Sequence, residues 1–145
     1  MKSDNIIKIE FLSKSCNEGF ARVAIAALAT QLDPTLEQIS EIKTAVSEAV
    51  TNCIVHGYKD NIGKIYISAR INKNKLTVTV RDKGCGIENI EEAREPLFTT
   101  GDESERSGMG FTIMESFMDK VTVRSQLGKG TRVTMSKLIK TKAEI

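Results

Sequence analysis

The sequence lacks the features of a membrane or secreted protein. Although 40% of its 145 residues are hydrophobic, charged residues interrupt every apolar stretch well short of the ~20 residues that span a bilayer. Residues Met1 to Glu10 lack the apolar centre of a signal peptide, so we expect a cytoplasmic protein without membrane association. The length favours a single domain over residues 1–145.

Cysteine and charge exclude further classes. Cys16, Cys53 and Cys85 are odd in number and widely spaced, so they form neither a disulfide framework nor the CxxC ligand pair of a zinc site, and we expect free thiols. The formal net charge is +2 and no basic block stands out along the chain. Direct binding of nucleic acid is therefore not indicated.

Apolar periodicity in the first half of the chain predicts one strand and two helices. Alternation over Ile7–Leu12 indicates an edge strand, and spacings of three and four residues over Glu18–Leu32 indicate a helix that ends at Asp33. Thr35 is the predicted N-cap of a second helix that stops at Gly57. The apolar face predicted for the first helix consists of Phe20, Val23, Ala24, Ala27, Leu28 and Leu32.

In the second half of the chain, apolar residues recur at every second position. Ile65–Ile71 and Leu76–Val80 form one predicted hairpin, and Val121–Ser125 and Thr131–Lys137 form another. A short helix is predicted near Met109–Met118. Because hairpins dominate over βαβ alternation, we expect an α/β two-layer sandwich whose sheet is mixed but largely antiparallel, with the helices on one face.

Glu48 and Asn52 form the first candidate chemical pair. They are four residues apart on the second predicted helix, so they share one face and can line a common cleft. The amide oxygen of Asn52 suits Mg²⁺, which completes its shell with water and substrate phosphates. Glu48 could accept a proton from an attacking hydroxyl. From spacing alone, a solvated Glu and a surface Asn remain the alternative.

Two glycine strings suggest a nucleotide pocket. Asp82 ends a predicted strand and can accept a hydrogen bond from an exocyclic amine, while Gly84 and Gly86 let the backbone approach a ligand or adopt positive φ. Gly108 and Gly110 precede an apolar helical run, where free amides favour phosphate. A plain turn and a flexible helix entry are the alternatives. Neither string completes GxGxxG, which disfavours a Rossmann fold, and no P-loop or protein-kinase signature is present.

In this order, the motifs resemble the boxes of the GHKL (Bergerat-fold) ATPase and kinase superfamily. The matching strings are Glu48-x-x-x-Asn52 with His56-Gly57, Asp82-x-Gly84-x-Gly86, the lid-like Pro96-Leu97-Phe98-Thr99-Thr100, Arg106-Ser107-Gly108-Met109-Gly110-Phe111 and Gly130-Thr131. Within the superfamily, Ser47–Asn52 and Glu105–Glu115 look most like the small anti-sigma factor serine kinases of sporulation. The resemblance covers nearly the whole chain.

The resemblance implies an ATP-dependent serine kinase that converts ATP to ADP with Mg²⁺. It also implies that the chain sequesters a sigma factor of the sigma F type, phosphorylates an anti-anti-sigma protein and forms a homodimer. In these terms Glu48 is the general base, Asn52 the Mg²⁺ ligand, and Arg106 a cation that steadies the transferred phosphoryl group. Arg22, on the outer face of the first helix, is the implied contact for both partners. The implied adenine contacts are Asp82, Gly86 and Thr131, and the implied lid and phosphate contacts are Thr99, Thr100, Arg106, Ser107, Gly108, Met109 and Gly110.

Two departures and two rival functions accompany this resemblance. Gly101-Asp102 replaces the Lys-Pro that we associate with sporulation members, and Cys85 is unusual in the first glycine string.

One rival function is that of the ATP-binding half of a histidine kinase, although the single histidine, His56, lies inside the nucleotide box and no phosphoacceptor helix is present. The other is a sequestering module that binds nucleotide only as a structural switch.

Overall fold

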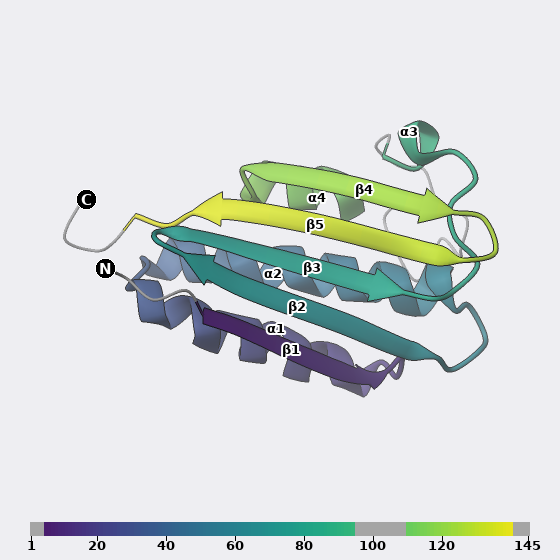
Figure 1. The fold of residues 1–145 in the computed structure, drawn as a ribbon, viewed down its shortest axis with the longest axis horizontal. Helices are drawn as coiled ribbons and strands as arrows, with labels where there is room; N and C mark the ends of the chain where they lie inside the picture. Colours follow the sequence, from purple (N-terminus) through teal and green to yellow (C-terminus); the bar gives the residue numbers. More distant parts are fainter. Residues whose placement is uncertain (1–4, 95–109, 141–145) are drawn as a thin grey trace.

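The structure, a computed structural model, describes residues 5–94 and 110–140, which form an α/β sandwich of two layers (Figure 1). One layer is a five-stranded sheet in the order β1-β2-β3-β5-β4. Its strands are β1 (Asn5–Leu12), β2 (Lys64–Asn72), β3 (Lys75–Asp82), β4 (Lys120–Gln126) and β5 (Gly130–Leu138). The other layer contains α1 (Cys16–Ala29), α2 (Leu36–Asn52) and α4 (Gly110–Phe117). None of the described helices is long and apolar enough to cross a membrane.

The sheet confirms the predicted sandwich with its helices on one face. Both predicted hairpins form, as β2–β3 and β4–β5, and β1 lies at the edge of the sheet as expected. Among the described residues all four strand pairings are antiparallel, so the parallel pair expected of a mixed sheet does not occur there. Figure 1 looks onto the open face of the sheet, with α1, α2 and α4 behind it.

The apolar face predicted for α1 is only partly confirmed, because Leu28 and Leu32 are buried but other members are exposed. Phe20 and Val23 are 57% and 56% exposed. The helix is apolar around much of its circumference, so more than one set of residues satisfies the three- and four-residue spacing, and contact with α2 and the sheet selects among them. The buried α1 residues, together with Leu32 in the short 3₁₀ turn Thr30–Leu32 that follows, are Ala21, Ile25, Ala26, Leu28, Ala29 and Leu32.

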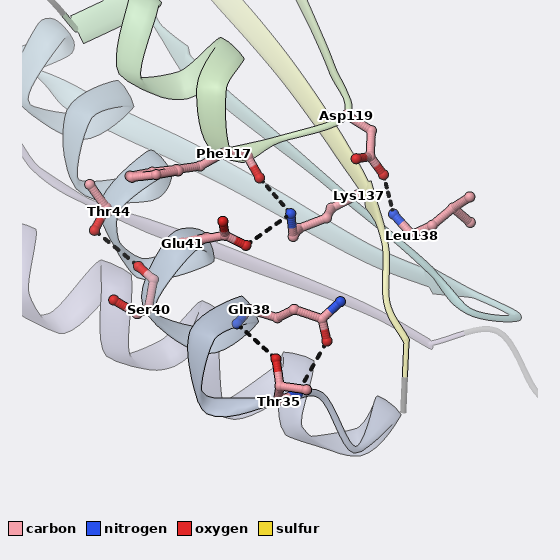
Figure 2. Close-up of polar contacts among 9 residues, drawn as sticks. All are labelled: Thr35, Gln38, Ser40, Glu41, Thr44, Phe117, Asp119, Lys137 and Leu138. Carbon is pink, nitrogen blue, oxygen red and sulfur yellow. Dashed lines mark hydrogen bonds and ion pairs between the residues drawn. The ribbon is translucent and has the colours of Figure 1, made fainter. Parts of the chain in front are cut away.

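Helix α2 begins as the sequence predicts and ends in an unpredicted way. The Thr35 hydroxyl accepts a hydrogen bond from the Gln38 amide at 3.1 Å, and the Gln38 side chain accepts one from the Thr35 amide at 3.1 Å (Figure 2). At the other end the α-helix stops at Asn52 and continues as a π turn over Cys53–Gly57. The Tyr58 amide closes this wider turn by donating to the Cys53 carbonyl at 2.9 Å.

A buried lysine joins β5 to two helices. The ammonium of Lys137 lies 3.2 Å from the Glu41 carboxylate on α2 and donates to the Phe117 carbonyl at the end of α4 at 2.6 Å (Figure 2). Lys137 is only 8% exposed, so its charge depends on these two partners for compensation. The contact links α4 to α2 at the end of the sheet opposite the cavity described in the next subsection.

The N-cap of α2 gives a direct test of this local structure. We expect Thr35→Ala to lower the free energy of unfolding by about 1 kcal/mol, because the amide of Gln38 loses its partner. The control is Thr44→Ala, whose hydroxyl donates to the Ser40 carbonyl within the helix, and which should change stability by less than about 0.5 kcal/mol. Urea denaturation measures both, and equal losses would contradict the assigned cap.

Candidate functional site

A cavity of about 650 Å³ lies where α2 and β3 end and β5 begins. Its size falls within the roughly 300–1,000 Å³ of small-molecule sites. Side chains from the end of α2, the π turn, the glycine loop after β3, the start of β5 and α3 (Ile90–Ala93) line it. The lining residues used below are Asn52, Cys53, Asp82, Gly86, Asn89 and Thr131.

Asp82 is the buried acidic group of this cavity. It is 4% exposed, and its carboxylate accepts a hydrogen bond from the Gly84 amide at 2.9 Å. Burial raises the pKa of Asp82, while hydrogen bonds from the Gly84 amide, the Cys53 thiol and the Thr131 amide act in the opposite direction. A hydrogen-bond acceptor in such a poorly solvated position binds a donor more strongly than it would in water.

The glycine loop approaches the π turn closely. A Cβ at Gly84 would lie 2.1 Å from the carbonyl oxygen of Gly57, which excludes any other residue without a shift of the backbone. The same carbonyl accepts a hydrogen bond from the Cys85 amide at 2.8 Å. Gly86 has φ +78°, a conformation that favours glycine. We expected the glycines to let the backbone approach a ligand, and at Gly84 the approach is to the chain itself.

Ser125 supports the cavity wall at Thr131. Its hydroxyl lies 2.8 Å from the Thr131 hydroxyl, accepts from the Ile87 amide at 2.7 Å and donates to the Gly130 carbonyl at 2.9 Å. The β4–β5 register brings Ser125 opposite Thr131. The sequence carries no local signal for this role, because it depends on the pairing of two strands.

Of the two residues predicted as a pair on α2, Asn52 lines the cavity and Glu48 lies next to it. Asn52 is the last residue of α2 and lines the cavity. Glu48 is half-buried one turn earlier on the same helix and is not among the described residues that line the cavity. The structure thus brings Asn52, Asp82, Gly86 and Thr131 around one cavity, with Glu48 and Gly84 next to it.

The remaining predicted residues lie elsewhere. Gly110 is buried at the start of α4. Arg22 lies on α1, half-buried, with its guanidinium 2.7 Å from the Glu18 carboxylate. Eight residues of the predicted lid, namely Thr99, Thr100, Gly101, Asp102, Arg106, Ser107, Gly108 and Met109, lie outside the described residues.

Two parts of the cavity wall were not predicted. The polar residues after Glu88 include α3, whose N-cap Asn89 accepts a hydrogen bond from the Glu92 amide at 3.0 Å. An Asn followed three residues later by Glu is a helix-start signal, so the sequence could have indicated α3. From the sequence, Cys53 was expected only to be a free thiol. Its thiol also bonds to Asp82, and burial raises the pKa of that thiol.

The donor atoms at the cavity limit the kind of metal that it can hold. No group of three or more His, Cys, Asp or Glu side chains within residues 5–94 and 110–140 is placed to hold a metal ion. Asn52 offers one amide oxygen at the wall. A single hard oxygen donor fits Mg²⁺ bound mainly through water and substrate phosphates, and it does not fit a metal enclosed by protein ligands.

Comparison with known proteins agrees with this geometry. The family profile described as "Histidine kinase-like ATPase domain" matches residues 17–137. A protein named anti-sigma F factor from Thermoanaerobacter sp. (strain X514) is 60% identical over 139 residues, which cover 96% of this chain and 97% of that one. The chain belongs to the anti-sigma F factor family. It therefore carries a nucleotide-binding domain of the histidine kinase-like ATPase type.

Other relatives agree with membership of the anti-sigma F factor family. The anti-sigma F factor of Clostridium perfringens (strain SM101 / Type A) is 56% identical, over 95% of this chain and 99% of its own. The catalytic domain of the histidine kinase ThkA, in a nucleotide-free form, matches with a TM-score of 0.58 at 19% identity, over 96% of this chain and 99% of that one. Full-length ShkA in complex with AMPPNP matches with a TM-score of 0.57 at 17% identity, over 86% of this chain and 30% of that one. At these identities the two kinase structures establish the fold alone.

The raised pKa of Asp82 has a testable consequence for stability. Burial disfavours the ionised carboxylate in the folded chain relative to the unfolded chain, so Asp82→Asn should unfold at a higher temperature than the parent at pH 7.5. This gain should shrink as the pH falls through the folded pKa of Asp82 toward the ordinary carboxyl range. If Asp82 accepts a hydrogen bond from the base, as the motif resemblance implies, ATP affinity should also fall by roughly 10- to 100-fold, because a charge-assisted acceptor is lost.

Thermal unfolding at several pH values and a nucleotide-binding titration measure the two effects of Asp82→Asn. The matched control is Asp119→Asn, which alters a carboxylate bonded to the Leu138 amide at 2.7 Å near the end of β5 (Figure 2). That variant should keep the ATP affinity of the parent. A lower unfolding temperature for Asp82→Asn at pH 7.5 would show that the carboxylate stabilises the fold.

Proposed function

We propose that this chain is an ATP- and Mg²⁺-dependent protein serine kinase that also binds and inhibits a sigma factor of the sigma F type. The main support for the proposal is the 60% identity to a protein named anti-sigma F factor, over nearly the full length of both chains. The cavity at the end of α2 supports the nucleotide part. The kinase substrate is the anti-anti-sigma protein, and transfer to it releases ADP.

We propose that ATP enters the cavity with its adenine next to Asp82. The buried carboxylate accepts a hydrogen bond from the exocyclic amine of the base, and Gly86 and Thr131 contact the same ring. The support is the position of these residues on one wall, where Ser125 holds the Thr131 hydroxyl at 2.8 Å. The phosphates extend toward the start of α4 at Gly110, where helix amides favour negative charge.

The proposed transfer uses Glu48, Asn52 and Arg106. Glu48 takes the proton of the substrate serine as its oxygen bonds to the γ-phosphorus, and the bond from that phosphorus to the bridging oxygen of ADP breaks. Mg²⁺, when bound, neutralises charge on the phosphate oxygens, and Asn52 is the residue that would hold it. Arg106 steadies negative charge on the transferred group. Glu48 and Asn52 lie one helical turn apart, which supports this division of roles.

Replacing the proposed base tests the kinase activity. Glu48→Gln should lower phosphoryl transfer by at least about 100-fold, because the amide cannot take a proton, while ATP affinity changes little. The matched control is Glu37→Gln, on the exposed first turn of the same helix, which should transfer phosphate at the parental rate. Radiolabel from γ-labelled ATP on the anti-anti-sigma protein measures transfer, and full transfer by Glu48→Gln would refute the assigned base.

The chemistry of the labelled product separates the rival functions. Acid-stable phosphate on serine supports the proposal, whereas acid-labile phosphate supports a histidine kinase activity. Absence of transfer by the parent protein, with unchanged binding of the sigma factor, supports a sequestering module that binds nucleotide as a switch. Phosphosite mapping on the partner identifies the residue directly.

For partner binding, we propose the outer face of α1 around Arg22. The Arg22 side chain is 40% exposed and paired with Glu18. Phe20 and Val23 on the same helix are 57% and 56% exposed. Exposed apolar side chains and arginines are both enriched in protein-binding surfaces. The sigma factor and the anti-anti-sigma protein would then compete for this surface. We also propose that the chain is a homodimer, which its mass in solution would test.

Truncating Arg22 tests the proposed surface. Arg22→Ala should weaken binding of the sigma factor by at least about 10-fold, since arginines at the centre of an interface commonly contribute more than 1 kcal/mol. Arg70→Ala is the matched control, because Arg70 is exposed on β2, in the layer opposite the helices. Calorimetric titration with the sigma factor in Mg-ADP measures both affinities. Unchanged affinity for Arg22→Ala would exclude this residue from the interface.

A further inference from the structure

Three arginines form a row across the open face of the sheet. The strand register places Arg81 on β3 opposite Arg132 on β5, and Arg132 opposite Arg124 on β4. Neighbouring strands lie ~4.8 Å apart, so the row spans about 10 Å. We call Arg81, Arg132 and Arg124 the arginine row. Its strands are the upper three in Figure 1, which looks onto this face.

The arginine row lacks compensating charge among the described residues. None of the ion pairs within residues 5–94 and 110–140 includes any of the three arginines. The next positions in the same row are Tyr66 and Glu10, and the Glu10 carboxylate is paired with Lys64 at 3.2 Å. Like charges directly opposite each other on neighbouring strands destabilise a sheet. The row therefore opposes folding.

Tyr66 holds Arg81 in place, and nearby lysines add positive charge. The Arg81 guanidinium lies 4.6 Å from the centre of the Tyr66 ring, and the Lys83 ammonium lies 5.1 Å from it. The arginine row, Lys83 and Lys129 line a shallow hollow of about 580 Å³. Asp82 also borders this hollow, but its carboxyl is buried and accepts a hydrogen bond from the Gly84 amide.

A row of hydroxyl groups lies beside the arginine row on the same face. Ser68, Thr79, Thr134 and Thr122 occupy successive strands two residues along from Tyr66, Arg81, Arg132 and Arg124. The hydroxyls of Thr79 and Thr134 lie 3.4 Å apart. The face therefore offers guanidinium forks next to groups that can both donate and accept hydrogen bonds.

We propose that the arginine row is a docking site for an acidic segment of a partner protein. Guanidinium groups bind carboxylates through two parallel hydrogen bonds. In an extended segment, alternate side chains lie roughly 7 Å apart, so two carboxylates fit within the row. A partner that neutralises the row recovers the stability that the repulsion removes.

The same geometry argues against nucleic acid as the occupant. Stable binding to a phosphate backbone commonly uses about 6–10 contacts, more than a row of three arginines and two lysines supplies. The Tyr66 ring already contacts Arg81 and Lys83, so it is not free to stack on a base.

The arginine side chains lie on the opposite face of the sheet from the nucleotide cavity, although Asp82 and Thr131 border both hollows. Successive residues of a strand point to opposite faces, so Arg81 and Arg132 face away from their neighbours Asp82 and Thr131, which line the cavity. The inference therefore does not depend on the proposed kinase activity. Loss of binding at the row should leave ATP affinity unchanged.

The test uses the full chain and a fluorescent hexaglutamate peptide, with binding followed by anisotropy. The triple variant Arg81→Gln, Arg124→Gln, Arg132→Gln should weaken peptide binding by at least about 10-fold. The control Arg70→Gln, Lys75→Gln, Lys120→Gln removes the same charge from the same face, where these cations are not adjacent on neighbouring strands. It should change binding by less than about twofold. Equal weakening in both variants, or tighter binding of a DNA oligonucleotide of equal charge, overturns the proposal.

Thermal unfolding of the same two variants provides an independent measurement. If the arginine row serves binding and not stability, replacing it removes the repulsion between its guanidinium groups. The triple variant then unfolds at a higher temperature than the parent. The control variant unfolds close to the parental temperature. A lower unfolding temperature for the arginine variant identifies these side chains as structural and overturns the proposal.

Discussion

The close contact between the end of β3 and the π turn after α2 is the constraint on which the rest of the site depends. A Cβ at Gly57 would lie 2.8 Å from the Asp82 carboxylate, and one at Gly84 would lie 2.1 Å from the Gly57 carbonyl. The backbone segments can approach this closely only because both positions are glycine. The contact buries Asp82 beside Cys53 and places Asn52 on the same wall.

The sheet presents two surfaces of opposite character at this end. Residues that point toward the helices surround the cavity at the end of α2, and residues that point away form the arginine row. Each surface contains charge that opposes folding, as a buried carboxylate on one side and adjacent guanidiniums on the other. The stability that offsets both comes from the apolar core between the helices and the sheet. Functional groups that conflict with local stability are expected at binding sites.

Short-range rules predicted much of the architecture. The N-cap at Thr35, both hairpins and the strand end at Asp82 follow from the character of neighbouring residues, and the structure confirms them. The apolar face of α1 was predicted correctly at Leu28 and Leu32 but not at Phe20 and Val23, because a helix apolar on several sides satisfies more than one periodic pattern. Asn89 and Glu92 form a helix-start pattern that could have predicted the start of α3. The π turn carried none, since a single extra residue in a helical turn leaves the apolar spacing nearly unchanged.

By itself, the sequence determined the class of fold, the order of most elements and the candidate residues Glu48, Asn52 and Asp82, because periodicity and motif spacing are local properties. Thr131 entered only through the resemblance to the GHKL superfamily. Only the tertiary structure decided which of these residues share a cavity and that Ser125 supports Thr131. It also decided that Arg81, Arg132 and Arg124 stand in one row. The physical reason is strand register, which brings together residues far apart in the chain, such as Arg81 and Arg132, which are 51 positions apart. A small net charge therefore does not exclude a concentrated basic surface.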